Sequence, residues 1–128
     1  MKSPWCFVAL LVELAIIAGC GKPDKVDRIN SPNPDVFLTV ETNYALGPAA
    51  ADFTRIYAHL EAKGYSDKEL VLDGQYLQNT KVVWLSSNTV MLCISKGYTE
   101  SFRNYVGLRA GGVSEMIHTH FEEQCNAR

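Results

Sequence analysis

The apolar and polar residues of positions 36–42 alternate, which is the pattern of a half-buried β-strand. Val36 and Leu38 share one face of this predicted strand, and Thr39 and Glu41 share the other. Similar short segments predict strands at 69–72, 81–85, 89–95, 105–109 and 115–122, with turns at 73–74, 86–88 and 111–112 and a loop at 97–104. We therefore expect a mainly β protein, a small antiparallel sheet or sandwich of about six or seven strands.

The strands predicted at 81–85 and 89–95 form a hairpin that is apolar on both faces. Strands that consist of unbroken apolar runs are usually covered on both sides. We therefore expect this hairpin in the middle of the sheet, with a second layer over it.

Residues 48–63 carry two conflicting patterns. Pro48 at a first helical position and Gly64 after the segment are signals for the start and the stop of a helix. The apolar residues from Phe53 to Leu60 fit a helical spacing, but the same stretch also alternates like a strand. The pattern leaves two folds open, a mainly β domain with a strand here or an α+β domain with a helix at 48–63.

Residues 1–19 have the layout of a secretory signal. Lys2 supplies a positive start, and the apolar run that ends at Ala18 is shorter than the about 20 apolar residues that span a bilayer. The small residues Ala18 and Gly19 precede Cys20, and this box closely resembles the cleavage box of bacterial lipoproteins. The resemblance implies that the signal is removed and that Cys20 becomes the lipidated N-terminus, anchored durably by two or three acyl chains such as palmitate.

The resemblance also implies a place in the cell. Inner-membrane lipoproteins of Gram-negative bacteria usually have an aspartate after the lipidated cysteine, whereas this chain has Gly21. We therefore expect a protein of the bacterial cell envelope, and in a Gram-negative source the outer membrane facing the periplasm is favoured over the inner membrane.

Residues 20–35 are predicted to be a flexible, lipid-anchored tether. This segment holds three prolines and alternating charges, with only Val26 and Ile29 to bury. Such a composition favours an extended, hydrated linker. The folded part is then a single β domain at 36–128.

Charge and cysteine content narrow the picture further. The chain has 12 basic and 14 acidic side chains and no basic cluster, which argues against a nucleic-acid partner. Of the four cysteines, Cys6 would leave with the signal and Cys20 would carry lipid. Cys93 and Cys125 remain in an oxidising compartment, so we expect them to form a disulfide bond.

The segment from Trp84 to Cys125 resembles a group of uncharacterised small bacterial lipoproteins and secreted domains. The matching features are the strand that ends at Trp84, the apolar strand that carries Cys93, the run 97–104 and the terminal cysteine. The resemblance implies a mainly β domain and favours a strand at 53–61. It implies no activity.

Two groups of residues are candidate sites. His118, His120 and Glu122 fall at alternate positions of the last predicted strand and should face solvent, opposite Ile117 and Phe121. Imidazole and carboxylate groups bind zinc or copper, so this strand is either a metal site or the wet face of a sheet.

Tyr98, Phe102 and Arg103 are the second group, because aromatic residues and arginine dominate binding hot spots. The alternative is a loop folded onto the sheet, in which Phe102 is buried and Arg103 pairs with Glu100.

The sequence contains neither a Gly-x-Ser-x-Gly elbow nor a phosphate-binding glycine loop. We therefore expect a non-enzymatic envelope lipoprotein with no cofactor besides the covalent lipid on Cys20. Its expected partners are the lipid bilayer and a periplasmic protein, as for a periplasmic inhibitor or immunity protein. The alternative is an envelope structural or metal-binding lipoprotein.

Overall fold

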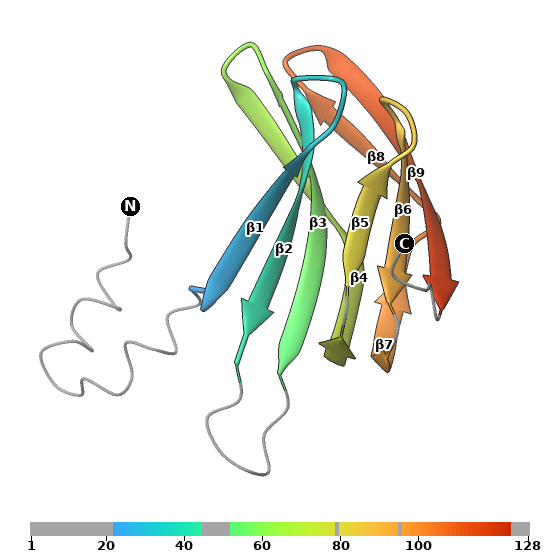
Figure 1. The fold of residues 1–128 in the computed structure, drawn as a ribbon. Helices are drawn as coiled ribbons and strands as arrows, with labels where there is room; N and C mark the ends of the chain where they lie inside the picture. Colours follow the sequence, from blue (N-terminus) through green and yellow to red (C-terminus); the bar gives the residue numbers. More distant parts are fainter. Residues whose placement is uncertain (1–21, 45–51, 79, 95, 124–128) are drawn as a thin grey trace, which may run out of the picture.

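The computed structural model describes residues 22–44, 52–78, 80–94 and 96–123, and the regular elements in these ranges are all strands (Figure 1). The nine strands are β1 (Lys25–Asn30), β2 (Val36–Asn43), β3 (Phe53–Ala62), β4 (Tyr65–Gln78), β5 (Lys81–Trp84), β6 (Thr89–Ile94), β7 (Lys96–Phe102), β8 (Tyr105–Ala110) and β9 (Val113–Glu123). The prediction of a mainly β fold is confirmed.

The strands form two sheets that pack face to face as a sandwich (Figure 1). The first sheet has the order β1-β2-β3-β4-β7, and the second has the order β5-β6-β9-β8. All neighbours pair antiparallel except β6 and β9, which run parallel. The chain leaves the second sheet after β6, adds β7 to the first sheet, and returns with β8. The core lies between the sheets and includes Leu38, Ile56, Leu60, Leu72, Leu92, Leu108 and Ile117.

The segment with two conflicting patterns is a strand in its described part. β3 pairs with β2 on one side and β4 on the other, and Ile56, Ala58 and Leu60 are fully buried in the core. Every second side chain of β3 faces the second sheet. Burial of these side chains therefore favours a strand, in which successive side chains point to opposite faces. The helix considered for 48–63 is therefore wrong for residues 53–62, and residues 48–51 lie outside the described part.

The predicted flexible tether at 20–35 is wrong for residues 25–30. Residues 25–30 form β1, which pairs with β2 from Lys25 opposite Thr42 to Asn30 opposite Phe37. An edge strand is stabilised through backbone hydrogen bonds to one neighbour, so it needs few apolar side chains. Ile29 supplies one of them, and the Trp84 indole donates a hydrogen bond to its carbonyl oxygen (3.3 Å).

Two other local predictions were also wrong. Residues 96–102 form β7 rather than part of a loop, and β4 continues through the turn predicted at 73–74. A Cβ atom on Gly74 would lie 2.7 Å from the carbonyl oxygen of Tyr98, so this glycine allows close approach of β7 instead of making a turn.

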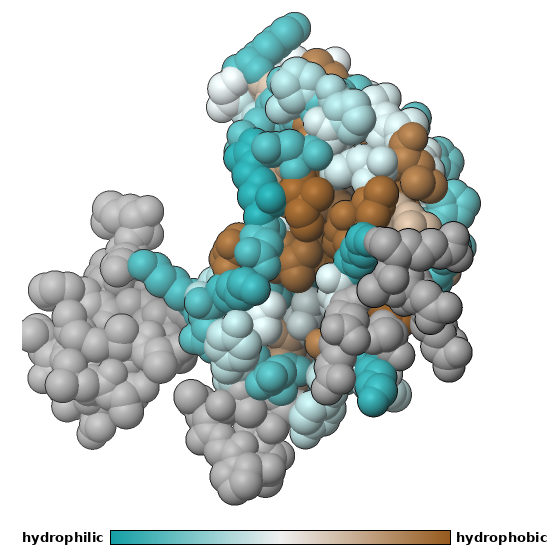
Figure 2. Space-filling model, in the orientation of Figure 1, coloured by the Kyte–Doolittle hydropathy of each residue, from teal (hydrophilic) through white to brown (hydrophobic). Residues whose placement is uncertain are grey.

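The prediction that the apolar hairpin lies in the middle of the sheet holds for β6 but not for β5. β6 lies between β5 and β9, whereas β5 forms one edge of the second sheet. Beside it, Figure 2 shows apolar side chains gathered between β1 and β5. Ile29, Val82 and Trp84 are partly buried against the core on this side.

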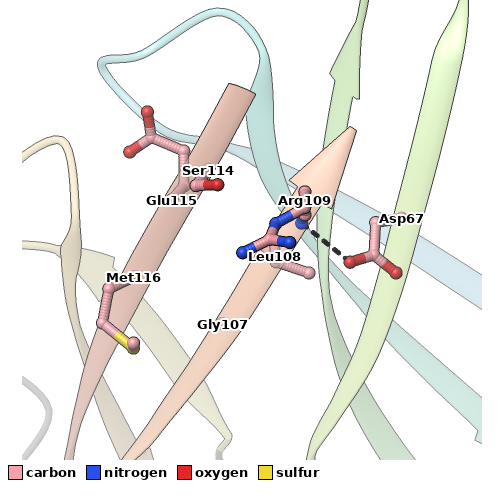
Figure 3. Close-up of a pocket in the computed structure, with 7 residues that line it drawn as sticks. All are labelled: Asp67, Gly107, Leu108, Arg109, Ser114, Glu115 and Met116. Carbon is pink, nitrogen blue, oxygen red and sulfur yellow. Dashed lines mark hydrogen bonds between the residues drawn. The ribbon is translucent and has the colours of Figure 1, made fainter. Parts of the chain in front are cut away.

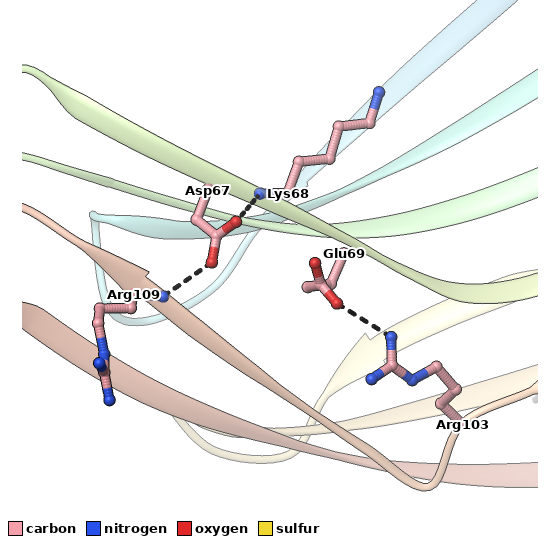
Figure 4. Close-up of polar contacts among 5 residues, drawn as sticks. All are labelled: Asp67, Lys68, Glu69, Arg103 and Arg109. Carbon is pink, nitrogen blue, oxygen red and sulfur yellow. Dashed lines mark hydrogen bonds and ion pairs between the residues drawn. The ribbon is translucent and has the colours of Figure 1, made fainter.

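On the opposite side, polar contacts join β4 to the β8 region (Figure 4). The Asp67 carboxylate accepts hydrogen bonds from the backbone amides of Arg109 (2.9 Å) and Lys68 (2.8 Å). The Arg103 guanidinium donates to the Glu69 carboxylate (3.1 Å), and the Arg103 amide donates to the Val71 carbonyl (2.9 Å). These contacts fix the position of β8 along β4.

Candidate binding surface on the second sheet

The register of the second sheet brings side chains from four strands onto one face, which we call the outer face. Val83 of β5 lies beside Met91 of β6, and Met91 lies beside His120 of β9. On the other flank of β9, His118 lies beside Tyr105 of β8 and Met116 lies beside Gly107. The centre of the outer face therefore consists of Val83, Thr89, Met91, Tyr105, Gly107, Met116, His118 and His120.

The alternation of β9 decides which of its residues reach this face. Ile117 is fully buried and Thr119 is 6% exposed. His118, which lies between them, and His120, which follows Thr119, are exposed. Burial of apolar area is favourable by about 25 cal/mol per Å², so Ile117 fixes the orientation of the whole strand. The predicted orientation of His118, His120 and Glu122 toward solvent is confirmed.

The outer face has the composition of a protein interface. Tyr105 is 58% exposed and Met116 is 47% exposed, and the rings of Tyr105 and His118 lie tilted with centroids 6.2 Å apart. Tyrosine and methionine are enriched at interfaces, and charged residues are depleted from interface centres. The eight central residues include no carboxylate, lysine or arginine, and the charged residues Lys81, Arg109 and Glu122 lie at the margins of the same face.

A hollow with three charged residues in its lining borders the outer face at Gly107. The hollow has a volume of about 430 Å³, and Figure 3 shows the side chains around it. It is lined by Asp67, Gly107, Leu108, Arg109, Ser114, Glu115 and Met116. A Cβ atom on Gly107 would meet only the Met116 methyl group, at 3.7 Å. The site could therefore accept a small partner side chain.

His118, His120 and Glu122 share a face but do not converge on one point. Alternate positions of a strand lie about 7 Å apart, so the first and the last of these three are separated by about 13 Å along β9. Zinc–ligand bonds are about 2 Å long. In the described part of the chain, no group of three His, Cys, Asp or Glu side chains is arranged to hold a metal ion.

Tyr98, Phe102 and Arg103 do not form one surface. Tyr98 is 63% exposed on β7, whereas the Phe102 ring packs against the core, with its centroid 5.3 Å from that of Phe121. Arg103 pairs with Glu69, not with Glu100 as we had considered. The aromatic–arginine cluster predicted as a hot spot is thus divided between surface and core.

Of the four cysteines, the structure describes only Cys93. Cys93 on β6 is 3% exposed and disulfide-bonded, and it lies opposite Glu122 of β9 in the parallel register. Cys125, its predicted partner, lies outside the described residues, as does Cys20. In the sequence only two residues lie between Glu122, which is opposite Cys93, and Cys125. Pairing of Cys93 with Cys125 stays a prediction.

Gly107 and Met116 were not predicted from the sequence to belong to a binding surface. The alternation of β8 contained the signal, since Val106 and Leu108 are buried and the residues between them point outward. Their neighbours on the face come from strands distant in sequence, so no local pattern connects them.

Comparisons with models of protein families, with curated proteins and with solved structures found no match to this chain. Within the described residues, no helix is long and apolar enough to cross a membrane.

Proposed function

We propose that this protein is a lipid-anchored component of the bacterial envelope that binds another protein through the outer face of its second sheet. It acts without catalysis, as a periplasmic inhibitor or immunity protein does. The observation that carries the proposal is the centre of the outer face, which has no carboxylate, lysine or arginine and exposes Tyr105 and Met116 beside the hollow at Gly107.

The surface favours a protein partner for physical reasons. Tyrosine and methionine offer large contact areas, and tyrosine is among the residues that carry most binding energy at interfaces. A side chain of the partner would enter the hollow at Gly107, and the charged residues around the face would form the rim of the interface. Sequence supports the anchor, because the box before Cys20 resembles that of lipoproteins.

The binding proposal can be tested by site-specific photocrosslinking in cells of the source organism. Benzoylphenylalanine replaces Tyr105 in one variant and Tyr65 in a control, since Tyr65 is 67% exposed and lies outside the outer face. We expect one discrete protein adduct from position 105 and none from position 65. Equal adducts from both positions, or no adduct from position 105, would contradict the proposal.

A second variant separates specific from adventitious capture. Gly107→Lys fills the hollow with a long side chain, and Ser101→Lys places the same side chain on exposed β7 of the first sheet as a matched control. The adduct should disappear with Gly107→Lys and persist with Ser101→Lys.

The anchor is tested separately. Cys20→Ala should abolish incorporation of radiolabelled palmitate and release the protein from the membrane fraction. An unlabelled wild-type protein, or a variant that stays in the membrane fraction as the wild type does, would remove the lipoprotein assignment.

A further inference from the structure

One end of the sandwich, which we call the β1 end, contains the start of β1 and the termini of the strands beside it, including the ends of β6 and β9. Lys25 at the start of β1 pairs with Thr42 near the end of β2, and Phe53 at the start of β3 pairs with Gln75 of β4. At the same end, β5 starts at Lys81 and β7 pairs its first residue, Lys96, with β4. This is the lower end of the sandwich in Figure 1.

Three tyrosines are exposed at the β1 end. Tyr44 directly follows β2 and is 51% exposed, Tyr76 is 54% exposed, and Tyr98 is 63% exposed. The Tyr76 amide donates to the carbonyl oxygen of Asp52 (3.0 Å), and Tyr98 pairs with the neighbouring Gln75. Tyr76 and Tyr98 therefore lie close together on β4 and β7, and Tyr44 lies across the strand termini from them.

Tyr76 is held in an unusual backbone conformation. Its φ angle is +55°, in the left-handed region that is unfavourable for residues other than glycine. Tyr76 lies where the pairing of β4 with β7 shifts register, between Gln75 and Gln78. An exposed aromatic side chain thus stands at an irregular point of the strand, at the end of the sandwich.

The chain before β1 is tied down close to this end. The Asp24 amide donates to the Thr42 carbonyl (2.9 Å), and the Asp24 carboxylate accepts from the Tyr44 amide (2.7 Å). Only four residue steps separate Asp24 from Cys20, and four residues span at most about 14 Å. A lipid on Cys20 would thus hold the β1 end within about 14 Å of the bilayer surface.

The charges of the β1 end are mixed and do not favour anionic lipid. Among the described residues, the charged side chains there are of both signs and include Lys22, Lys25, Arg55, Lys81, Lys96, Asp24, Asp27, Glu41, Asp52, Asp73 and Glu122. Tyrosine, by contrast, is a residue type enriched at the membrane–water interface, where its ring and hydroxyl suit the headgroup region.

We propose that the β1 end docks on the lipid bilayer, with Tyr44, Tyr76 and Tyr98 at headgroup level. The proposal rests on the lipid anchor of the proposed function, and it adds an orientation to it. The strands then stand upright on the membrane. The outer face of the second sheet points sideways, open to a partner in the periplasm.

The test uses the full acylated protein on phosphatidylcholine vesicles, with tyrosine nitration measured by mass spectrometry. Tyr65 and Tyr105 are internal references, since they are as exposed as the three docking tyrosines (67% and 58%) but lie away from the β1 end. We expect nitration of Tyr44, Tyr76 and Tyr98 to be several-fold slower than that of the references. The difference should depend little on salt, because phosphatidylcholine carries no net charge.

Three outcomes are distinguishable. Equal nitration of all five tyrosines on protein that floats with the vesicles would overturn docking and leave the anchor intact. Protein that does not float with vesicles would remove the anchor and the docking together. Slow nitration at the β1 end alone supports both.

Variants provide a further check. Tyr76→Ser with Tyr98→Ser should leave flotation unchanged, because the lipid anchors the protein, but should speed nitration of Tyr44 several-fold. Tyr65→Ser with Tyr105→Ser is the matched control and should leave Tyr44 nitration unchanged. Trp84 fluorescence verifies that both variants are folded.

Discussion

The imidazole of His59 lies flat against the phenyl ring of Phe37, with ring centroids 4.5 Å apart and planes at 6°. The Arg28 guanidinium lies 3.6 Å from the centroid of the same phenyl ring. His59 Nε2 also forms a hydrogen bond with the Thr39 hydroxyl (2.7 Å). This cluster lies on the solvent side of the first sheet. Phe37 is nevertheless only 4% exposed, because the side chains of Arg28 and His59 cover its ring.

The surroundings of His59 predict a pH-dependent stability. Burial lowers the pKa of His59 below its ordinary value of 6.5, and nearby Lys68 and Arg28 lower it further, against the opposite effect of Glu41 and Glu61. In the unfolded chain the imidazole binds its proton at a higher pH than in the folded protein. The unfolding free energy should therefore fall as pH drops from about 6.5 toward the lowered pKa.

Urea unfolding at pH 7.5, 6 and 5 measures this effect. The wild type should lose more stability on acidification than His59→Gln, which has no proton to bind. Parallel pH profiles of the two proteins would show that His59 does not contribute.

Neighbouring residues of β9 should differ sharply in their importance for stability. Ile117→Ala leaves a cavity in the core and should cost about 2–5 kcal/mol of unfolding free energy. His118→Ala removes an exposed side chain and should change the unfolding free energy by less than about 0.5 kcal/mol. Chemical denaturation of both variants checks the strand orientation, and a larger loss with His118→Ala would refute it.

Replacement by alanine should change the stability in opposite directions at Gly107 in β8 and at Gly111 in the turn that follows β8. Gly107 has room for a Cβ atom, and replacement in a strand should be neutral or stabilise by about 0.5 kcal/mol. Gly111 has a φ angle of +57°, and a Cβ atom there would lie 2.5 Å from the Ala62 carbonyl oxygen. Gly111→Ala should therefore destabilise by about 1 kcal/mol or more, as measured by the thermal midpoint. Similar midpoints for the two variants would contradict the described turn.

The disulfide of Cys93 gives a fourth prediction. Pairing with Cys125 would close a loop of roughly 30 residues, so Cys125→Ser should cost about 3–4 kcal/mol in the loop-entropy model. Cys93→Ser and the double variant should lose similar amounts, since each breaks the same bond. Peptide mapping without reduction identifies the partner, and a Cys93 peptide joined to any other cysteine would exclude the predicted pair.

The sequence by itself determined most strands and the direction in which their side chains point. Alternation at 36–42 and 115–122 predicted β2 and β9, because an apolar residue such as Leu38 or Ile117 gains stability only when it faces the core. The same physical rule placed His118 and His120 on the solvent side. The lipid anchor at Cys20 is also an inference from sequence, and it remains a prediction.

Only the tertiary structure decided which strands meet. β1 and β7 are edge strands held largely by backbone hydrogen bonds, and such bonds leave little trace in side-chain patterns. The parallel pairing of β6 with β9 joins segments that are separated in the chain by β7 and β8. That pairing brings Met91 beside His120 and completes the outer face, which no local sequence pattern could specify because its residues become neighbours only when the sheets form.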